Sequence, residues 1–175
     1  MLTILEKSFK KIQSSIINNF KQVESSNNSQ ISSDTWKRTE GGGGKTFVIS
    51  DGNFFDNCAV NFSSIYGDKM PDSALGKKLA KKIDYGYQAM GVSVISHPKN
   101  PYVPSSHMNV RLFGILDKDK HIKEWWIGGG YDLTPYIPFS EDIISWHNAA
   151  KNTLNKYDKN FYKIFSENCN DYFYI

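Results

Sequence analysis

The stretch GVSVISHPKNPYVPSSHMNVRLFGILDKDKHIKEWWIGGGYDLT, residues Gly91–Thr134, decides the fold of this 175-residue chain. Gly91–His97 is rich in β-branched residues, His107–Phe113 alternates apolar and polar residues, and Trp125–Thr134 follows a polar turn. Each of these segments has the pattern of a β-strand. Pro98 ends the first strand, because proline has no N–H group for a strand ladder. The stretch therefore predicts three strands, the first two joined by a proline-rich loop.

The second predicted strand separates its side chains into two unlike faces, because side chains on a strand alternate with a period of two. One face is apolar, and we expect it to belong to the core: Met108, Val110 and Leu112. The other face presents an imidazole, an amide and a guanidinium: His107, Asn109 and Arg111. This set of polar groups predicts a functional face, and a solvated sheet face is the alternative interpretation.

The third predicted strand supports a functional face. Trp126, Gly128, Gly130 and Asp132 fall on one side of it. Glycine weakens a strand, so two glycines on one face indicate that something bulky and flat approaches the backbone there. If the polar faces of the two strands adjoin, we expect one concavity. It would be lined by His107, Asn109, Arg111 and Asp132, with Gly128 and Gly130 on its floor and Ser93 and His97 nearby.

The composition limits the class of protein. The length suits a single domain, with residues 1–35 as an N-terminal helix and linker and 36–175 as a sheet with flanking helices. A net charge of +3 is too small to predict binding to nucleic acid. Two cysteines, Cys58 and Cys169, without a secretion signal fit a reduced cytoplasmic protein. No apolar run approaches membrane-spanning length, so we expect no integral membrane segment.

Local patterns predict the remaining elements. Apolar residues at spacings of three and four predict a helix near 3–20, and packing against a sheet explains it better than an organelle presequence does. Phe47–Phe54 predicts a hairpin with an Asp-Gly turn, and Ala59–Tyr66 a further strand. Other helices are expected near 73–85, 141–154 and 159–172. The expected fold class is α+β, a mainly antiparallel sheet flanked by α-helices.

The residues before the hairpin carry no clear strand pattern. Residues 25–33 are polar and rich in asparagine, which predicts a linker or loop. The following GGGGKT run at 41–46 resembles a phosphate-binding loop, but Thr39 stands where that motif needs glycine, and a hairpin follows instead of a helix. We expect these glycines to form a flexible or tightly turned approach to the first strand.

Several segments together resemble the oxygen-dependent coproporphyrinogen III oxidases. They are WKRTEGGGG from Trp36, VNFS from Val60, GVSVISHPKNPYVPSSHMNVRLF from Gly91, WWIGGGYDLTPYIP from Trp125 and EDIISWH from Glu141. The resemblance spans about Trp36–Ile175. It implies a homodimeric enzyme that uses O₂, without an organic cofactor, to decarboxylate two propionates of coproporphyrinogen III to vinyl groups in haem biosynthesis. It also implies a large antiparallel sheet flanked by helices.

The resemblance implies roles for individual residues. His107 matches a proton donor, and Asp132 matches a carboxylate that holds the pyrrole N–H groups. The implied substrate contacts are Ser93, Asn109, Val110 and Arg111. The implied ligands of a divalent metal ion are His97, His107 and His147, and the fourth ligand that the family pattern places further on is missing.

Members of this family continue well beyond the point that matches Ile175. The chain also stops at an aromatic cluster without a helix cap, so we expect it to be incomplete, lacking the family's dimerising segment. Two hypotheses remain open from the sequence. The chain is an oxidase or the N-terminal part of one, or it is a catalytically inactive remnant that at most binds tetrapyrrole.

Overall fold

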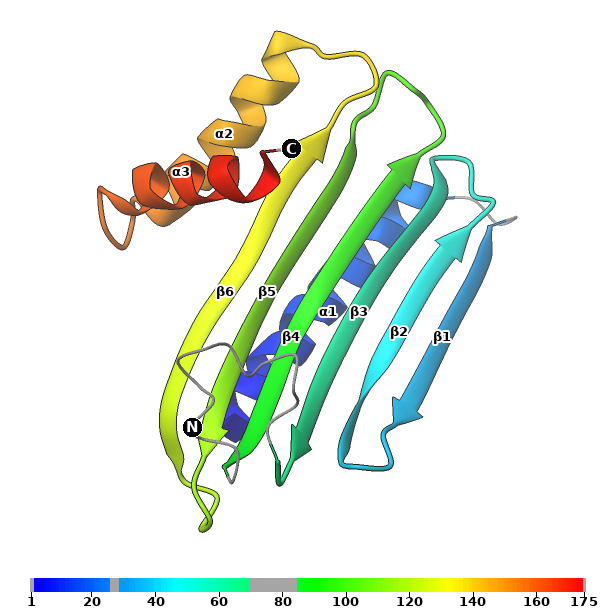
Figure 1. The fold of residues 1–175 in the computed structure, drawn as a ribbon. Helices are drawn as coiled ribbons and strands as arrows, with labels where there is room; N and C mark the ends of the chain where they lie inside the picture. Colours follow the sequence, from blue (N-terminus) through cyan, green and yellow to red (C-terminus); the bar gives the residue numbers. More distant parts are fainter. Residues whose placement is uncertain (1, 26–28, 70–84, 175) are drawn as a thin grey trace.

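A computed structural model of the chain describes residues 2–25, 29–69 and 85–174. The described part contains six strands and three helices (Figure 1). The strands are β1 (Gln30–Lys37), β2 (Gly42–Ser50), β3 (Phe55–Gly67), β4 (Gly86–Pro98), β5 (Ser105–Leu116) and β6 (Ile122–Thr134). The helices are α1 (Leu2–Glu24), α2 (Ser140–Leu154) and α3 (Phe161–Phe173). The helix predicted at 73–85 lies outside the described residues, apart from its last position.

The strands form one sheet in chain order, and every neighbouring pair is antiparallel. This arrangement confirms the predicted fold class, a mainly antiparallel sheet flanked by helices. β1 and β6 are the two edge strands of this sheet. Among the described residues, no helix is long and apolar enough to cross a membrane.

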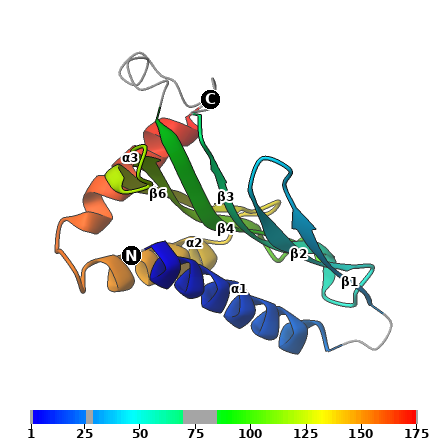
Figure 2. The same cartoon turned by 90° about the horizontal axis from the view of Figure 1, so that it is seen from below.

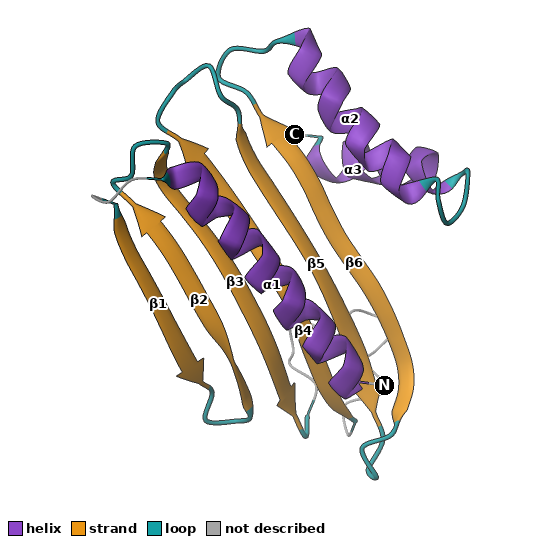
Figure 3. Cartoon of the chain, turned by 180° about the vertical axis from the view of Figure 1, so that it is seen from behind, coloured by secondary structure: helices purple, strands orange, loops and turns teal. Residues whose placement is uncertain are grey.

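The core lies between one face of the sheet and α1, which runs lengthwise over β3 and β4 (Figure 3). Phe9 and Ile17 are the buried apolar residues of the helix. They pack with alternating side chains of the strands, including Val60, Val92 and Leu112. α2 lies on the same side of the sheet as α1 (Figure 2), and the ring of its Trp146 stacks on Tyr131 of β6 at a centroid distance of 3.9 Å. We call this side the helix face and the opposite side the polar face.

The predicted Asp-Gly hairpin is confirmed, with β2 and β3 joined through Asp51 and Gly52. A carboxylate from the end of α1 holds this turn. Glu24 is only 2% exposed, and it accepts hydrogen bonds from the backbone N–H groups of Asn53, Phe54 and Phe55. A Cβ atom at Gly52 would lie 2.2 Å from Oε2 of Glu24, so the glycine makes room for the carboxylate.

The structure differs from the prediction before the hairpin. Residues 30–33, expected in a linker, belong to β1, which pairs with β2 along its whole length. All eight β1 residues are exposed, so the strand has no buried alternation that the sequence could reveal. The glycines of β2 are also strand residues. A Cβ atom at Gly44 would come within 2.5 Å of the Trp36 ring, so glycine allows this tryptophan to lie across the strand.

Candidate active site

Strand register brings the predicted site residues onto one face of the sheet. Residues paired across antiparallel strands point to the same side. Three rows cross β4, β5 and β6: Ile95–His107–Asp132, Ser93–Asn109–Gly130 and Gly91–Arg111–Gly128. These rows lie on the β4–β6 half of the polar face. The prediction that His107, Asn109, Arg111 and Asp132 share one side with Gly128 and Gly130 is therefore confirmed.

His107 and Asp132 are directly opposite each other on β5 and β6. Nδ1 of His107 lies 3.0 Å from Oδ1 of Asp132, and the two side chains are 34% and 27% exposed. The hydroxyl of Thr134 donates to the other carboxylate oxygen, Oδ2, over 3.4 Å. Because both residues are on strands, the backbone ladder fixes their spacing. This imidazole–carboxylate pair can exchange protons with a ligand above the sheet.

Arg111 stands between two glycines of its row. Its Nη1–H donates to Oδ1 of Asn109 over 3.2 Å, and the side chain is exposed. A Cβ atom at Gly91 would lie 3.0 Å from Cβ of Arg111, and one at Gly128 would lie 3.8 Å from its Nε. The guanidinium therefore has space on both sides. It is available for a bidentate pair with a carboxylate, the geometry that arginine favours.

Aromatic rings border the rows at the Arg111 end, a feature that sequence reasoning missed. Phe113 lies between Tyr87 and Trp126, with stacked centroid distances of 5.7 and 4.7 Å. Arg38 donates from Nη1 to the Tyr87 hydroxyl over 2.6 Å. The period-two pattern places Phe113 and Trp126 on the polar face, but only the register shows that their rings meet.

Two residues from the resemblance lie away from the polar face. Val110 points to the helix face, where it packs against the core, so only its backbone is near the rows. His147 lies on α2, and its Nδ1 is 3.0 Å from the hydroxyl of Tyr162 on α3. Because α2 lies on the helix face, His147 and the side chain of His107 are on opposite sides of the sheet.

Among the described residues, the three histidines that the resemblance implies as metal ligands are not grouped with one another. His97 shares the polar face with His107, but its Nδ1 lies 3.1 Å from the Ser105 hydroxyl. In the described part of the chain, one group of three residues has potential metal-ligand atoms within 4.8 Å of one another, and it lies in the β5–β6 turn. Its members are Asp117, Asp119 and His121. There, Asp117 accepts two backbone N–H bonds and the ammonium group of Lys123. The N–H of His121, with Lys123, lowers the pKa of Asp117, so the turn itself accounts for this grouping.

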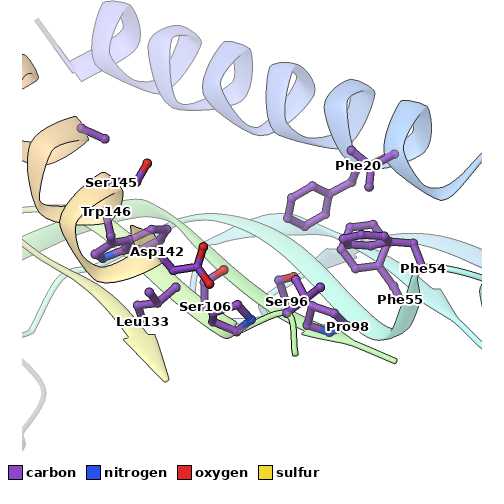
Figure 4. A pocket seen from close by; sticks show the side chains of 14 residues that line it. Phe20, Phe54, Phe55, Ser96, Pro98, Ser106, Leu133, Asp142, Ser145 and Trp146 are labelled. Atoms are coloured by element: carbon purple, nitrogen blue, oxygen red, sulfur yellow. The ribbon is translucent and has the colours of Figure 1, made fainter. Parts of the chain in front are cut away.

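A cavity of about 390 Å³ lies on the helix face, between the end of α1, the ends of β3 and β4, and α2 (Figure 4). Its lining is largely apolar, with Phe20 and Phe54 on one side and Trp146 on the other. Asp142 is the one charged residue among the described residues that line it. The cavity takes no lining residue from the three rows. The predicted concavity above the rows thus stays a prediction, whereas the shared face is established.

The fold and these rows define an α+β protein with a candidate anion-binding and proton-transfer face on an antiparallel sheet. A family model described as Coproporphyrinogen III oxidase matches residues 4–175. The oxygen-dependent coproporphyrinogen-III oxidase of Wigglesworthia glossinidia brevipalpis is 42% identical over 168 residues, which make up 95% of this chain and 54% of that relative. The chain belongs to the coproporphyrinogen III oxidase family, and it spans about half the length of the curated relative that it matches.

Proposed function

We propose that this chain serves the oxidative decarboxylation of coproporphyrinogen III to protoporphyrinogen IX. Each of two propionates loses CO₂ and a hydride equivalent to become a vinyl group, and O₂ takes up the hydrogen and electrons. The observation that carries the proposal is the polar face of a family member: a free guanidinium, an imidazole–carboxylate pair and glycine-cleared backbone in three adjacent rows. This set matches a flat substrate with acidic side chains.

Each group of the rows receives a role in this proposal. Arg111 pairs with a propionate, and Asn109 and Ser93 donate or accept hydrogen bonds beside it. The glycines let the macrocycle approach the strands. Asp132 accepts pyrrole N–H bonds through lone pairs that His107 and Thr134 leave free. His107 exchanges a proton with the substrate.

The remaining features of the enzyme rest on the family resemblance. We propose O₂ as the co-substrate, no organic cofactor, a homodimeric assembly and a cytoplasmic location. We assign no metal ion to His97, His107 and His147, because the described structure does not gather them, and no step of the proposed reaction passes through a metal.

A second candidate function is tetrapyrrole binding without turnover. The observation that favours it is length, since the chain spans only 54% of the relative named above. In addition, Arg111 is exposed, and His107 and Asp132 keep about a third of their surface in water. Water near developing charges weakens the electrostatic contacts that a closed site would strengthen. We therefore expect the chain alone to turn over much more slowly than the longer relative.

The assay supplies purified chain with coproporphyrinogen III in air and follows the divinyl product by chromatography. The relative from Wigglesworthia is the positive control, and protein-free autoxidation is the background. The oxidase function is supported if the wild-type chain forms product above background and His107→Ala does not. Saturable quenching of tryptophan fluorescence by the substrate, without product, supports the binding protein. Neither product nor binding would refute both functions for this chain.

A further inference from the structure

We propose that Asp132 is a positioning residue that holds His107 in the Nδ1–H tautomer, leaving the lone pair of Nε2 directed to a ligand. The inference deepens the proposed function, because it assigns the direction of proton transfer at His107. It makes neutral His107 a proton acceptor, whereas the family resemblance implies a donor.

The hydrogen-bonding capacity of the two groups decides which ring nitrogen carries the hydrogen. An ionised carboxylate can only accept hydrogen bonds, and a neutral imidazole has one N–H group and one lone pair. Nδ1 of His107 is 3.0 Å from Oδ1 of Asp132, a normal hydrogen-bond distance. The hydrogen must then be on Nδ1, so the lone pair is on Nε2. The bond made by one ring nitrogen sets the state of the other.

The other three histidines, all of which are described, have partners of a different kind. His97 faces the Ser105 hydroxyl and His147 faces the Tyr162 hydroxyl, and a hydroxyl can either donate or accept. Nδ1 of His121 is 3.8 Å from Oδ2 of Asp117, too far for a hydrogen bond. Of the four histidines, His107 alone has a partner that dictates its tautomer.

Strand pairing holds His107 and Asp132 at a fixed spacing. His107 and Asp132 are paired residues of the β5–β6 ladder, with the pairs Ser106–Leu133 and Asn109–Gly130 on either side, and sites on strands hold their geometry better than sites on loops. Thr134, two residues after Asp132 on the same side of β6, donates to the remaining carboxylate oxygen at 3.4 Å. Threonine, aspartate and histidine thus form a chain that ends at the free Nε2.

The chemical consequence is an order of events. A ligand N–H or C–H bond breaks and its electron pair stays on the ligand. The proton forms a bond with the lone pair of Nε2, and the resulting imidazolium lies against the Asp132 carboxylate, which stabilises it. His107 can donate a proton only after this step. Asp132 acts through His107 here, in addition to any contact of its own with the substrate.

The test is ¹⁵N NMR of the substrate-free chain at a pH where the imidazoles are neutral. Nitrogen shifts and two-bond couplings to the ring protons distinguish the N–H nitrogen from the one with the lone pair. His107→Gln assigns the signals. We expect His107 in the Nδ1–H form and His121 in the Nε2–H form that free imidazole side chains prefer. An Nε2–H form of His107 in the wild-type chain overturns the proposal without any variant.

Two substitutions add a matched comparison. Asp132→Ala should switch His107 to the Nε2–H form, whereas Asp119→Ala, which removes a carboxylate from the β5–β6 turn, should leave it unchanged. Thr134→Val should keep the tautomer and broaden the His107 signals. Retention of the Nδ1–H form in Asp132→Ala would overturn the proposal. These readouts need no substrate, so their failure is distinct from a failure of the turnover assay, which bears on the proposed function.

Discussion

Arg111 shows how a single residue is prepared for binding by its neighbours. It has glycine on both sides in its cross-strand row, and its hydrogen bond to Asn109 comes from the same strand, two residues away. The guanidinium is therefore oriented, and no carboxylate among the described residues forms an ion pair with it. A free, oriented cation on a sheet is expected to bind an anionic group.

Arg111→Ala should weaken binding of coproporphyrinogen III or its oxidised porphyrin by about 1.5 kcal/mol, roughly tenfold, because a charge-assisted pair is lost. Fluorescence titration measures the change. Lys118→Ala, which removes a positive charge in the β5–β6 turn, is the matched control and should change the affinity little. Equal losses in the two variants would indicate that net charge, and not the Arg111 site, governs binding.

Cys58 gives a prediction that depends on pH. It is fully buried on β3, and burial raises the pKa of its thiol from 9.0 to about 11. The thiol of the folded chain should then be half ionised only at about pH 11. Because the folded pKa is above the unfolded value, this group's contribution to stability is complete below pH 9.0 and is lost as the pH rises toward about 11.

Alkylation of native Cys169→Ser at pH 8 should accordingly be slow, and denaturant should make it fast. The single remaining thiol makes the result unambiguous, and Cys58→Ser, which keeps the partly buried Cys169, is the comparison. Rapid labelling of Cys58 in the native chain would contradict its burial.

Alternation predicted the faces of β5 and β6 correctly, because a strand with one buried side must keep the period of two. It could not predict the His107–Asp132 bond, since that depends on register. A shift of two residues keeps every side chain on its face but would place Gly130 or Thr134 opposite His107. Val110 shows a similar limit: the resemblance assigns it a contact, but the pleat directs its side chain to the core.

At the scale of elements, α1 is joined to the sheet by more than apolar packing. Gln13 donates from its side-chain amide to the backbone carbonyls of Lys45 and Val60, and Glu24 caps the β2–β3 turn. An acidic residue at a helix C-terminus is unfavourable for the helix dipole. The hydrogen bonds from the turn offset that cost. The sequence revealed the Asp-Gly turn, but it could not show that a distant carboxylate is the reason for the glycine.

Glu24→Ala should lower the free energy of unfolding by about 3 kcal/mol, because it leaves buried backbone N–H groups without an acceptor. Urea denaturation measures the shift of the midpoint, with the slope unchanged. Glu40→Ala is the control. It removes a carboxylate whose pair with Arg38 is exposed, and exposed pairs contribute little. A midpoint for Glu24→Ala close to that of Glu40→Ala would show that the turn forms without its cap.

At the scale of the whole molecule, the two sides of the sheet are unequally covered. α1 buries the centre of the helix face, but it does not reach β6, where Trp125 and Ile127 point to that face and are 54% and 56% exposed. No residue of α2 is buried. The two C-terminal helices pack chiefly against each other beyond the β6 edge (Figure 1). The sequence predicted these two helices, but it could not show which surface they meet.

These exposed surfaces predict self-association of the isolated chain. The exposed apolar side chains of the two helices include Ile144 at 58%, Ile164 at 47% and Phe165 at 44%. Apolar patches of this kind are rarely left open in monomers, and β6 adds a long edge with which no further described strand pairs. Light scattering after size exclusion should give a mass above 20.0 kDa that rises with protein concentration.

Substitution can locate the surface responsible. Ile144→Ser together with Phe165→Ser should shift the chain toward the 20.0 kDa monomer, because both changes remove apolar area from the helices without opening a core. Ile31→Ser is the matched control: it removes a side chain of similar exposure, 51%, from β1 at the opposite edge of the sheet. If only the Ile31 variant became monomeric, association would occur through β1. If the wild-type chain stayed at 20.0 kDa at every concentration, the exposed apolar side chains of the helices would not mediate self-association.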